Sequence, residues 1–151
     1  MLRVTVCTVG KPTAVSQPLV QHYQRMLRGF ANCKLIHLPE STVRGVTQAR
    51  AADAVAFAKV IPKGSQVIAL DTEGKTFLTH QFAQALKRFE DQGEHVVFLI
   101  GGPDGFAPEF VQQYQSWSLS DLTFPHQLAL VVLLEQVYRG LTIVHGKAYH
   151  R

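Results

Sequence analysis

The chain has 151 residues, of which 46% are hydrophobic and 17% are charged. This length fits one domain, and this balance excludes an intrinsically disordered chain. The formal net charge of +4 is compatible with a polyanionic partner but is too small to demonstrate one.

Short apolar strands alternate with helical segments along the chain. The strand predictions rest on apolar, β-branched runs, and the helix predictions rest on apolar residues at helical spacing. We expect strands at residues 2–9, 33–38, 67–70, 96–100 and 141–144, and helices at residues 17–30, 47–60, between Thr79 and Gly93, 108–114 and 126–138. Thr47 and Thr79 are expected to be N-caps, and Pro108 and Pro125 fit first helical turns.

This alternation has a direct consequence for the fold class. Strands that are apolar on both faces belong to parallel sheets that helices cover on both sides. We therefore expect a single α/β domain over residues 1–151, with a parallel sheet and helices on both faces.

Neither end of the chain suggests a membrane or an export signal. The longest purely apolar run, residues 128–134, is far shorter than the about 20 residues that a membrane-spanning helix needs. The N-terminus has no apolar segment of the kind that a signal peptide carries. Cys7 and Cys33 lie in strand-like runs, and two free thiols are favoured over one disulfide. We expect a cytoplasmic protein that spans no membrane.

Ligands of parallel sheets bind beyond the carboxyl ends of the strands. Three loops qualify, namely residues 71–75, residues 101–106 and residues 118–125. Each loop also has a plainer interpretation: Gly-Pro-Asp-Gly forms ordinary turns, Asp71 can cap a turn, and the serine-rich loop can simply lead into a helix. No dinucleotide fingerprint or P-loop occurs, and the histidines and cysteines lack metal-ligand spacing, so no metal site is predicted.

Two C-terminal features call for a partner. The segment 128–134 is apolar on all sides, so it must be covered either by its own core or by a second subunit, and the second subunit is favoured. Tyr149, His150 and Arg151 end the chain. They are either a solvated terminus or an aromatic and cationic surface suited to RNA.

Six motifs, in this order, carry a family resemblance. They are VTVCTVGK, VIALDTEGK, FLIGGPDGF, WSLSDLTFPHQ, LLEQVYR and GKAYHR. Together they resemble the bacterial large-subunit rRNA pseudouridine N3-methyltransferases of the SPOUT superfamily. The resemblance implies one α/β domain with a C-terminal trefoil knot, a homodimer, and S-adenosylmethionine as cofactor without a metal. It also implies methylation of a pseudouridine in the assembled ribosome.

The resemblance assigns roles to particular residues. The expected cofactor contacts are Leu70, Gly101, Leu119, Ser120, Asp121, Leu122, Thr123 and Phe124. The N3 imide proton must be removed, or the resulting anion stabilised, before the nitrogen can attack. His126, His150 and Arg151 are the groups available for this step, with Tyr149 as a stacking or hydrogen-bonding partner.

The chain departs from the family pattern at two places. Leu130 stands where the family usually has Arg, and residues 48–51 replace an acidic segment. The first change would remove a cation near the expected RNA or dimer surface. Two other functions are considered: a SPOUT methyltransferase acting on another RNA such as tRNA, and, because of Leu130, a non-catalytic ribosome-binding relative.

Overall fold

The computed structural model describes residues 1–42 and 45–151, and over these residues it contains five strands and five helices. The strands are β1 (Leu2–Val9), β2 (Ala31–Leu38), β3 (Gln66–Lys75), β4 (His95–Ile100) and β5 (Gln115–Trp117). The helices are α1 (Gln17–Leu27), α2 (Val46–Val60), α3 (Thr79–Asp91), α4 (Pro108–Val111) and α5 (His126–Val144).

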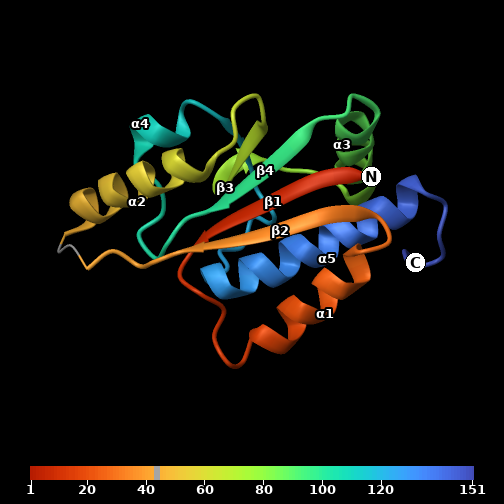
Figure 1. Cartoon of the computed structure of the whole chain (residues 1–151), viewed down its shortest axis with the longest axis horizontal. Coiled ribbons are helices and arrows are strands. Elements are labelled where there is room, and N and C mark those ends of the chain that lie inside the picture. The colour runs from red at the N-terminus through yellow and green to blue at the C-terminus, as the bar shows by residue number, and fades with distance from the viewer. Residues whose placement is uncertain (43–44) are drawn as a thin grey trace.

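The strands form one sheet in the order β2-β1-β4-β3-β5, and every neighbouring pair is parallel. Figure 1 shows α2 and α4 on one side of this sheet and α1 and α5 on the other. The helix α3 packs against α5. The predicted α/β class, with a parallel sheet covered on both faces, is confirmed.

Alternate side chains of the strands enter two separate cores. Val4 and Val6 of β1 belong to the larger cluster, which α1, α3 and α5 cover. Cys7 and Val9 face the opposite way, into a smaller cluster with Phe57 of α2. Each fully buried aliphatic side chain contributes about 1.5–3 kcal/mol of transfer free energy, so both faces of the sheet resist exposure.

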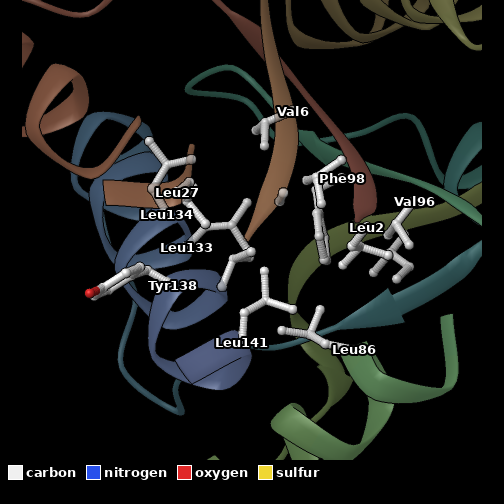
Figure 2. Packing of buried hydrophobic residues seen from close by; sticks show 14 of the residues in the cluster. Leu2, Val6, Leu27, Leu86, Val96, Phe98, Leu133, Leu134, Tyr138 and Leu141 are labelled. Atoms are coloured by element: carbon white, nitrogen blue, oxygen red, sulfur yellow. The ribbon is translucent and has the colours of Figure 1, made fainter. Parts of the chain in front are cut away.

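The long helix α5 is a core element. Its length and composition would allow it to cross a membrane, but half of that apolar stretch is buried inside the structure. Figure 2 shows Leu133, Leu134 and Leu141 of α5 among side chains from α1, α3 and the sheet. Gly140 permits the close packing on α3, because a Cβ atom there would lie 2.8 Å from Leu86 Cδ1. Its own chain therefore covers much of α5.

The prediction of a strand at residues 141–144 is wrong, because α5 continues to Val144. Val137, Tyr138 and Leu141 are all buried, and their spacing keeps them on one helical face. Burial of that face outweighs the β-branched character of the last residues. The prediction of a helix to residue 114 is also too long, since α4 ends at Val111 and β5 follows.

Both predicted N-caps are displaced by one or two residues. Helix α3 begins at Thr79 itself, and Leu78 at its N-cap position donates its backbone N–H to Gln81 Oε1 over 2.8 Å. Helix α2 begins at Val46, after Gly45 with φ of +94°. Cys7 and Cys33 are free thiols, as favoured, and burial raises the pKa of each to about 11.

Candidate active site

The irregular end of β3, the loop after β4 and the loop between β5 and α5 meet at the carboxyl edge of the sheet and border three neighbouring cavities. The expectation of a loop at residues 71–75 is wrong, because β3 continues to Lys75 after a register shift. The glycine cavity has a volume of about 460 Å³ and is bordered by Gly101, Thr123 and His126. The tryptophan cavity has a volume of about 330 Å³ and is bordered by Trp117, Leu119 and Ser120. A smaller cavity of about 80 Å³ also includes Leu122 in its wall. Leu70 and Phe124 border all three cavities.

The predicted cofactor residues therefore converge. All of them border these cavities except Asp121, which is exposed beyond them. Strand β3 supplies Leu70, strand β4 leads directly into Gly101, and the remaining residues lie in the loop between β5 and α5. Most side chains in the set are apolar, so the backbone provides most of the polar groups here.

The glycine-rich segment after β4 is a turn that also forms a cavity wall. Gly105 has φ of +73°, and its N–H donates to the carbonyl of Gly102 over 3.0 Å. A Cβ atom on Gly101 would lie 3.2 Å from the carbonyl carbon of Gly105. The turn interpretation is confirmed, and its closeness to Gly101 leaves little room for a side chain.

Asp71 caps a turn, as the plainer interpretation expected. Its Oδ1 accepts a hydrogen bond from the backbone N–H of Glu73 over 3.0 Å. Leu70 and Lys75 both pair with Trp117 of β5, so the register of β3 shifts between them. The regular pairing of β3 with β5 is therefore interrupted after Leu70, next to the cavities.

The loop between β5 and α5 is held by its own serines. Ser118 Oγ donates to the carbonyl of Ser120 over 2.8 Å, and Ser120 Oγ accepts from the N–H of Leu122 over 3.0 Å. These bonds satisfy polar groups that would otherwise favour a looser loop. They hold Leu119 and Leu122 against the cavities.

Gln127 was not among the predicted site residues, yet it connects two loops. Its Nε2 donates to the carbonyl of Lys11, and its Oε1 accepts from Thr13 N–H, both over 3.0 Å, and from Ser16 Oγ over 2.8 Å. The start of α5 is thereby attached to the loop between β1 and α1. Its place at the end of the motif WSLSDLTFPHQ was the only signal in the sequence.

His126 is half-buried and borders the glycine cavity. The Nε2 atom of the Gln127 amide lies 3.2 Å from the Nε2 atom of His126. An amide nitrogen only donates, so His126 Nε2 is the acceptor in this contact and the ring proton sits on Nδ1.

The C-terminal tail folds back onto α5. Tyr149 Oη donates to Glu135 Oε1 over 3.1 Å, and the Arg139 guanidinium lies 4.8 Å from the centre of the Tyr149 ring. Arg139 also donates to His150 Nδ1 over 3.1 Å and forms an ion pair with Glu135 over 2.6 Å. Arg151 is exposed. Sequence reasoning missed Glu135 and Arg139, whose i, i+4 spacing is also common in plain surface ion pairs.

These contacts constrain the chemistry of the tail. Burial, together with the hydrogen bond to Glu135, raises the pKa of Tyr149 to about 12. Tyr149 is therefore protonated near neutral pH and acts as a hydrogen-bond donor rather than a base. Arginine only donates, so His150 Nδ1 must be unprotonated in its contact with Arg139.

Within one chain, the four predicted catalytic residues form two groups. His126 starts α5, whereas Tyr149 and His150 contact Glu135 and Arg139. At a rise of 1.5 Å per residue, Glu135 and Arg139 lie roughly 14 Å and 20 Å from His126 along the axis of α5. The structure therefore does not bring His126 and the tail together.

A family model described as "Predicted SPOUT methyltransferase" matches residues 2–150. The chain belongs to the SPOUT methyltransferase family. Relatives named "Ribosomal RNA large subunit methyltransferase H" include that of Polynucleobacter asymbioticus, 48% identical over 153 residues, and that of Neisseria meningitidis serogroup C, 36% identical over 155 residues. Each alignment covers 99% of this chain and 99% of the relative.

A solved SPOUT-like neighbour supports the fold alone. The crystal structure of TrmJ from Z. mobilis superposes with a TM-score of 0.56 at 12% sequence identity. The superposition covers 94% of this chain and 70% of TrmJ.

The departures from the expected SPOUT pattern have structural explanations. Leu130 is 3% exposed and lies in the larger core, so the expectation that this position faces RNA or a dimer surface is wrong for this chain. In the segment 48–51, Arg50 Nε donates to the carbonyl of Asp104 over 2.6 Å. Arg50 thereby links α2 to the glycine-rich turn.

Potential metal ligands stay apart in the described part of this SPOUT chain. Among residues 1–42 and 45–151, no group of three or more His, Cys, Asp or Glu side chains could hold a metal ion. Asp53 lies near Asp104 and Glu40, and burial together with these carboxylates raises its pKa.

Proposed function

We propose that this chain is an S-adenosylmethionine-dependent methyltransferase that methylates N3 of a pseudouridine in large-subunit ribosomal RNA, on the assembled ribosome. The observation that carries the proposal is the full-length relationship to proteins named for large-subunit rRNA methylation. Residues 1–151 would act as one methyltransferase domain in the cytoplasm, where ribosomes are found.

The cavities suit S-adenosylmethionine. Ligand sites of this kind occupy about 300–1,000 Å³ and are mostly apolar with a few polar groups, and the two larger cavities fall in this range. Leu70, Leu119 and Phe124 would contact the apolar parts of the cofactor. Backbone groups near Gly101, and those of Ser120 and Thr123, would bind its polar parts. The close approach of Gly101 to the Gly105 backbone, which a side chain would disturb, helps to shape this wall.

When bound, S-adenosylmethionine supplies a methyl group already activated by the sulfonium. The protein's own task is to manage the N3 proton and the charge it leaves behind. We assign the proton to Nε2 of His126, which borders the glycine cavity, or to Nδ1 of His150. Each nitrogen would exchange its present donor, Gln127 or Arg139, for the N3 proton. Tyr149 would donate to a flanking carbonyl oxygen, and Arg151 would stabilise the anion.

A homodimer is part of the proposal. Leu128 at the start of α5 remains 45% exposed, and Val15 and Leu19 near the start of α1 are also exposed. Because α1 packs against α5, these side chains fit a common apolar surface. A second copy seated there would cover the part of α5 that its own chain leaves open.

The C-terminal trefoil knot is likewise proposed from the resemblance. Its support is the path of residues 118–125, which leave the edge strand β5, border the cavities at the ends of β3 and β4, and lead into α5 beside α1. Stretching a single molecule between its ends tests the knot, because a tightened knot leaves the chain shorter than its full contour length. Full extension would contradict it.

Transfer of tritiated methyl groups separates the three candidate functions. Purified ribosomes that lack the modification and purified tRNA would each be incubated with labelled S-adenosylmethionine. Label in large-subunit RNA, recovered as N3-methylpseudouridine, supports the proposal. Label in tRNA supports a methyltransferase for another RNA, and no label in either supports a non-catalytic relative. Ribosomes already modified are the control and should accept no label.

A further inference from the structure

A basic groove adjoins the tryptophan cavity. It has a volume of about 560 Å³ and runs between the end of β3 and the outer face of α3. Lys75, Gln81, Gln84 and Arg88 border it, as does Phe77. Phe77 also borders the tryptophan cavity. We call this feature the α3 groove. The side chain of Phe77 separates it from the proposed cofactor site.

The charge of the α3 groove is positive. Three cations border it, Lys75, Lys87 and Arg88, against the single carboxylate of Asp91. Lys87 is paired with Asp91 over 2.6 Å. Of the part of the chain that the structure describes, no carboxylate forms an ion pair with Lys75 or Arg88. These two cations remain available to an anionic partner.

The fold places Lys75 at the mouth of the site. Gly74 allows β3 to rejoin β5 there, because a Cβ atom at Gly74 would lie 2.5 Å from the backbone carbon of Ser116. The ammonium of Lys75 then lies 4.9 Å from the centre of the Phe77 ring, a cation–π contact. The Phe77 ring is itself 4.5 Å from the Trp117 ring, centre to centre. Lys75 is therefore directed toward the border between groove and cavity.

The wall of the α3 groove formed by α3 carries a row of side chains that can donate hydrogen bonds. Gln81, Gln84 and Arg88 are spaced three and four residues apart, so they share one face of α3. The row extends roughly 10 Å along the helix, about the rise of three nucleotides in one strand of a duplex. Amide and guanidinium groups are common ligands of nucleic-acid phosphates and sugars.

We propose that the α3 groove binds the phosphate backbone of the substrate RNA next to the target nucleotide, with Lys75 and Arg88 as the phosphate ligands. The inference rests on the proposed function, because it takes the substrate to be RNA. Continuity with the cavity through Phe77 carries it, since a flanking phosphate must lie close to the base that enters the site.

A second basic groove provides a matched comparison. Arg25 and Arg28 border a space of about 740 Å³ with Asn32 and Met1. Met1 and Asn32 lie at the amino ends of β1 and β2, and the two arginines lie at the C-terminal end of α1. This groove is therefore at the opposite edge of the sheet from the cavities. RNA that reaches the cavities does not have to contact this second groove. Among the described residues, the second groove has two arginine or lysine side chains without carboxylate partners, the same number as the α3 groove.

The test compares three double variants of the full chain for binding to purified ribosomes that lack the modification, over a series of salt concentrations. In the first, Lys75→Gln is combined with Arg88→Gln. In the second, Arg25→Gln is combined with Arg28→Gln and removes the same charge from the other groove. In the third, Lys75→Arg is combined with Arg88→Lys and preserves the charge. Cofactor affinity and melting temperature are measured for each.

Removing two phosphate contacts should lower the salt slope by about 1.4–1.8 and weaken ribosome binding by on the order of 30-fold at about 0.1 M salt. The charge-preserving variant and the Arg25/Arg28 variant should stay within a few-fold of the unsubstituted protein, and cofactor affinity should not change. Transfer at saturating ribosome should persist, with the loss confined to KM.

Three results would overturn the assignment: unchanged binding in the Lys75/Arg88 variant, an equal loss in the Arg25/Arg28 variant, or a parallel loss of cofactor affinity. The proposed function fails separately. If the unsubstituted protein binds no ribosome and methylates no RNA, both ideas fall. If it methylates ribosomes and the Lys75/Arg88 variant matches it in KM, only the groove assignment falls.

Discussion

Gly101 stands where β4 leaves the sheet and borders the glycine cavity. The Gly105 backbone lies so close that even a single Cβ atom would be 3.2 Å from it. At the residue scale, a side chain at Gly101 would therefore displace the turn that borders the proposed cofactor site. Ser120, by contrast, mainly holds its own loop through the bond to Leu122.

We predict that Gly101→Val lowers the affinity for S-adenosylmethionine at least about 100-fold, whereas Ser120→Ala changes it only a few-fold. The unsubstituted protein should bind with a Kd of about 1–10 µM, roughly −7 to −8 kcal/mol. Calorimetry in the presence of a chelator measures both. Gly29→Val is the matched control, because nothing lies within 4 Å of a Cβ atom there. Wild-type affinity in Gly101→Val would refute the site.

The proton acceptor can be identified by single substitutions. Deleting the tail would confuse the result, because Tyr149 packs against the core and binds Glu135. We predict that either His126→Gln or His150→Gln lowers methyl transfer to ribosomes by about 10²-fold, with cofactor binding and melting temperature retained. Tyr149→Phe keeps the ring and removes only the hydroxyl group. If both histidine variants stay within a few-fold of the unsubstituted protein, neither is the acceptor.

His95 connects stability to pH. Its Nε2 lies 2.8 Å from Thr5 Oγ1, and burial, with Arg3 and Lys34 nearby, lowers its pKa from the ordinary value of 6.5. The unfolded chain therefore takes up this proton more readily than the folded chain, so acidification below about pH 6.5 favours unfolding. His37 shifts in the same direction through burial and Lys11.

We predict that the free energy of unfolding falls as the pH is lowered from about 7.5 to about 5.5, and that His95→Gln makes this fall smaller. Urea unfolding at a series of pH values measures it. Equal pH dependence in the variant and the unsubstituted protein would show that His95 does not contribute.

At the element scale, the pairing of β3 with β5 determines the end of the sheet next to the tryptophan cavity. Strand β5 has three residues, Gln115–Trp117, and no periodicity in the sequence marks so short an element. It exists because β3 rejoins it after the register shift, with Ser118 N–H donating to the carbonyl of Lys75 over 2.8 Å. This pairing also places Trp117 beside the tryptophan cavity.

We predict that Gly74→Ala destabilises the protein by about 1–3 kcal/mol, the usual cost of overpacking, because its Cβ atom would collide with the Ser116 backbone. Equilibrium urea unfolding measures the loss. Gly29→Ala places its Cβ atom in open space, so it should change the free energy of unfolding much less than Gly74→Ala does. Equal stability of the two variants would mean that β3 and β5 do not approach as closely as described.

The whole molecule leaves an apolar surface at α1 and α5. The side chains that cover α5 come mostly from its own chain, but Leu128 remains exposed. Val132 borders the tryptophan cavity, so a charge there would disturb the proposed cofactor site as well as any dimer. Leu128 is therefore the better position at which to test assembly.

We predict that the unsubstituted protein is a dimer of twice 16.8 kDa and that Leu128→Asp makes it a monomer. Light scattering at low micromolar concentration measures the mass. Val55→Asp is the control, because Val55 is 58% exposed and belongs to α2 on the opposite side of the sheet. A monomeric unsubstituted protein, or dissociation in both variants, would contradict an interface at Leu128.

The amino-acid sequence alone was enough to predict the class of the fold and the segments that border the cavities. Alternation of short apolar strands with helices is a local property, and it sufficed for the parallel sheet with helices on both faces. The motifs at the ends of β3 and β4, and the segment before α5, also predicted the three segments that border the cavities, although residues 71–75 belong to β3 and not to a loop. That prediction followed from one rule, that parallel strands end at one edge.

Only the tertiary structure decided which residues meet across that edge. It turned residues 141–144 into helix, because burying Leu141 on the face shared with Val137 outweighs β-propensity. It placed Leu130 in the core and attached Gln127 to the loop after β1. It also separated His126 from the tail and brought Glu135 and Arg139 to Tyr149. These outcomes depend on packing between segments far apart in the chain, which no local pattern records.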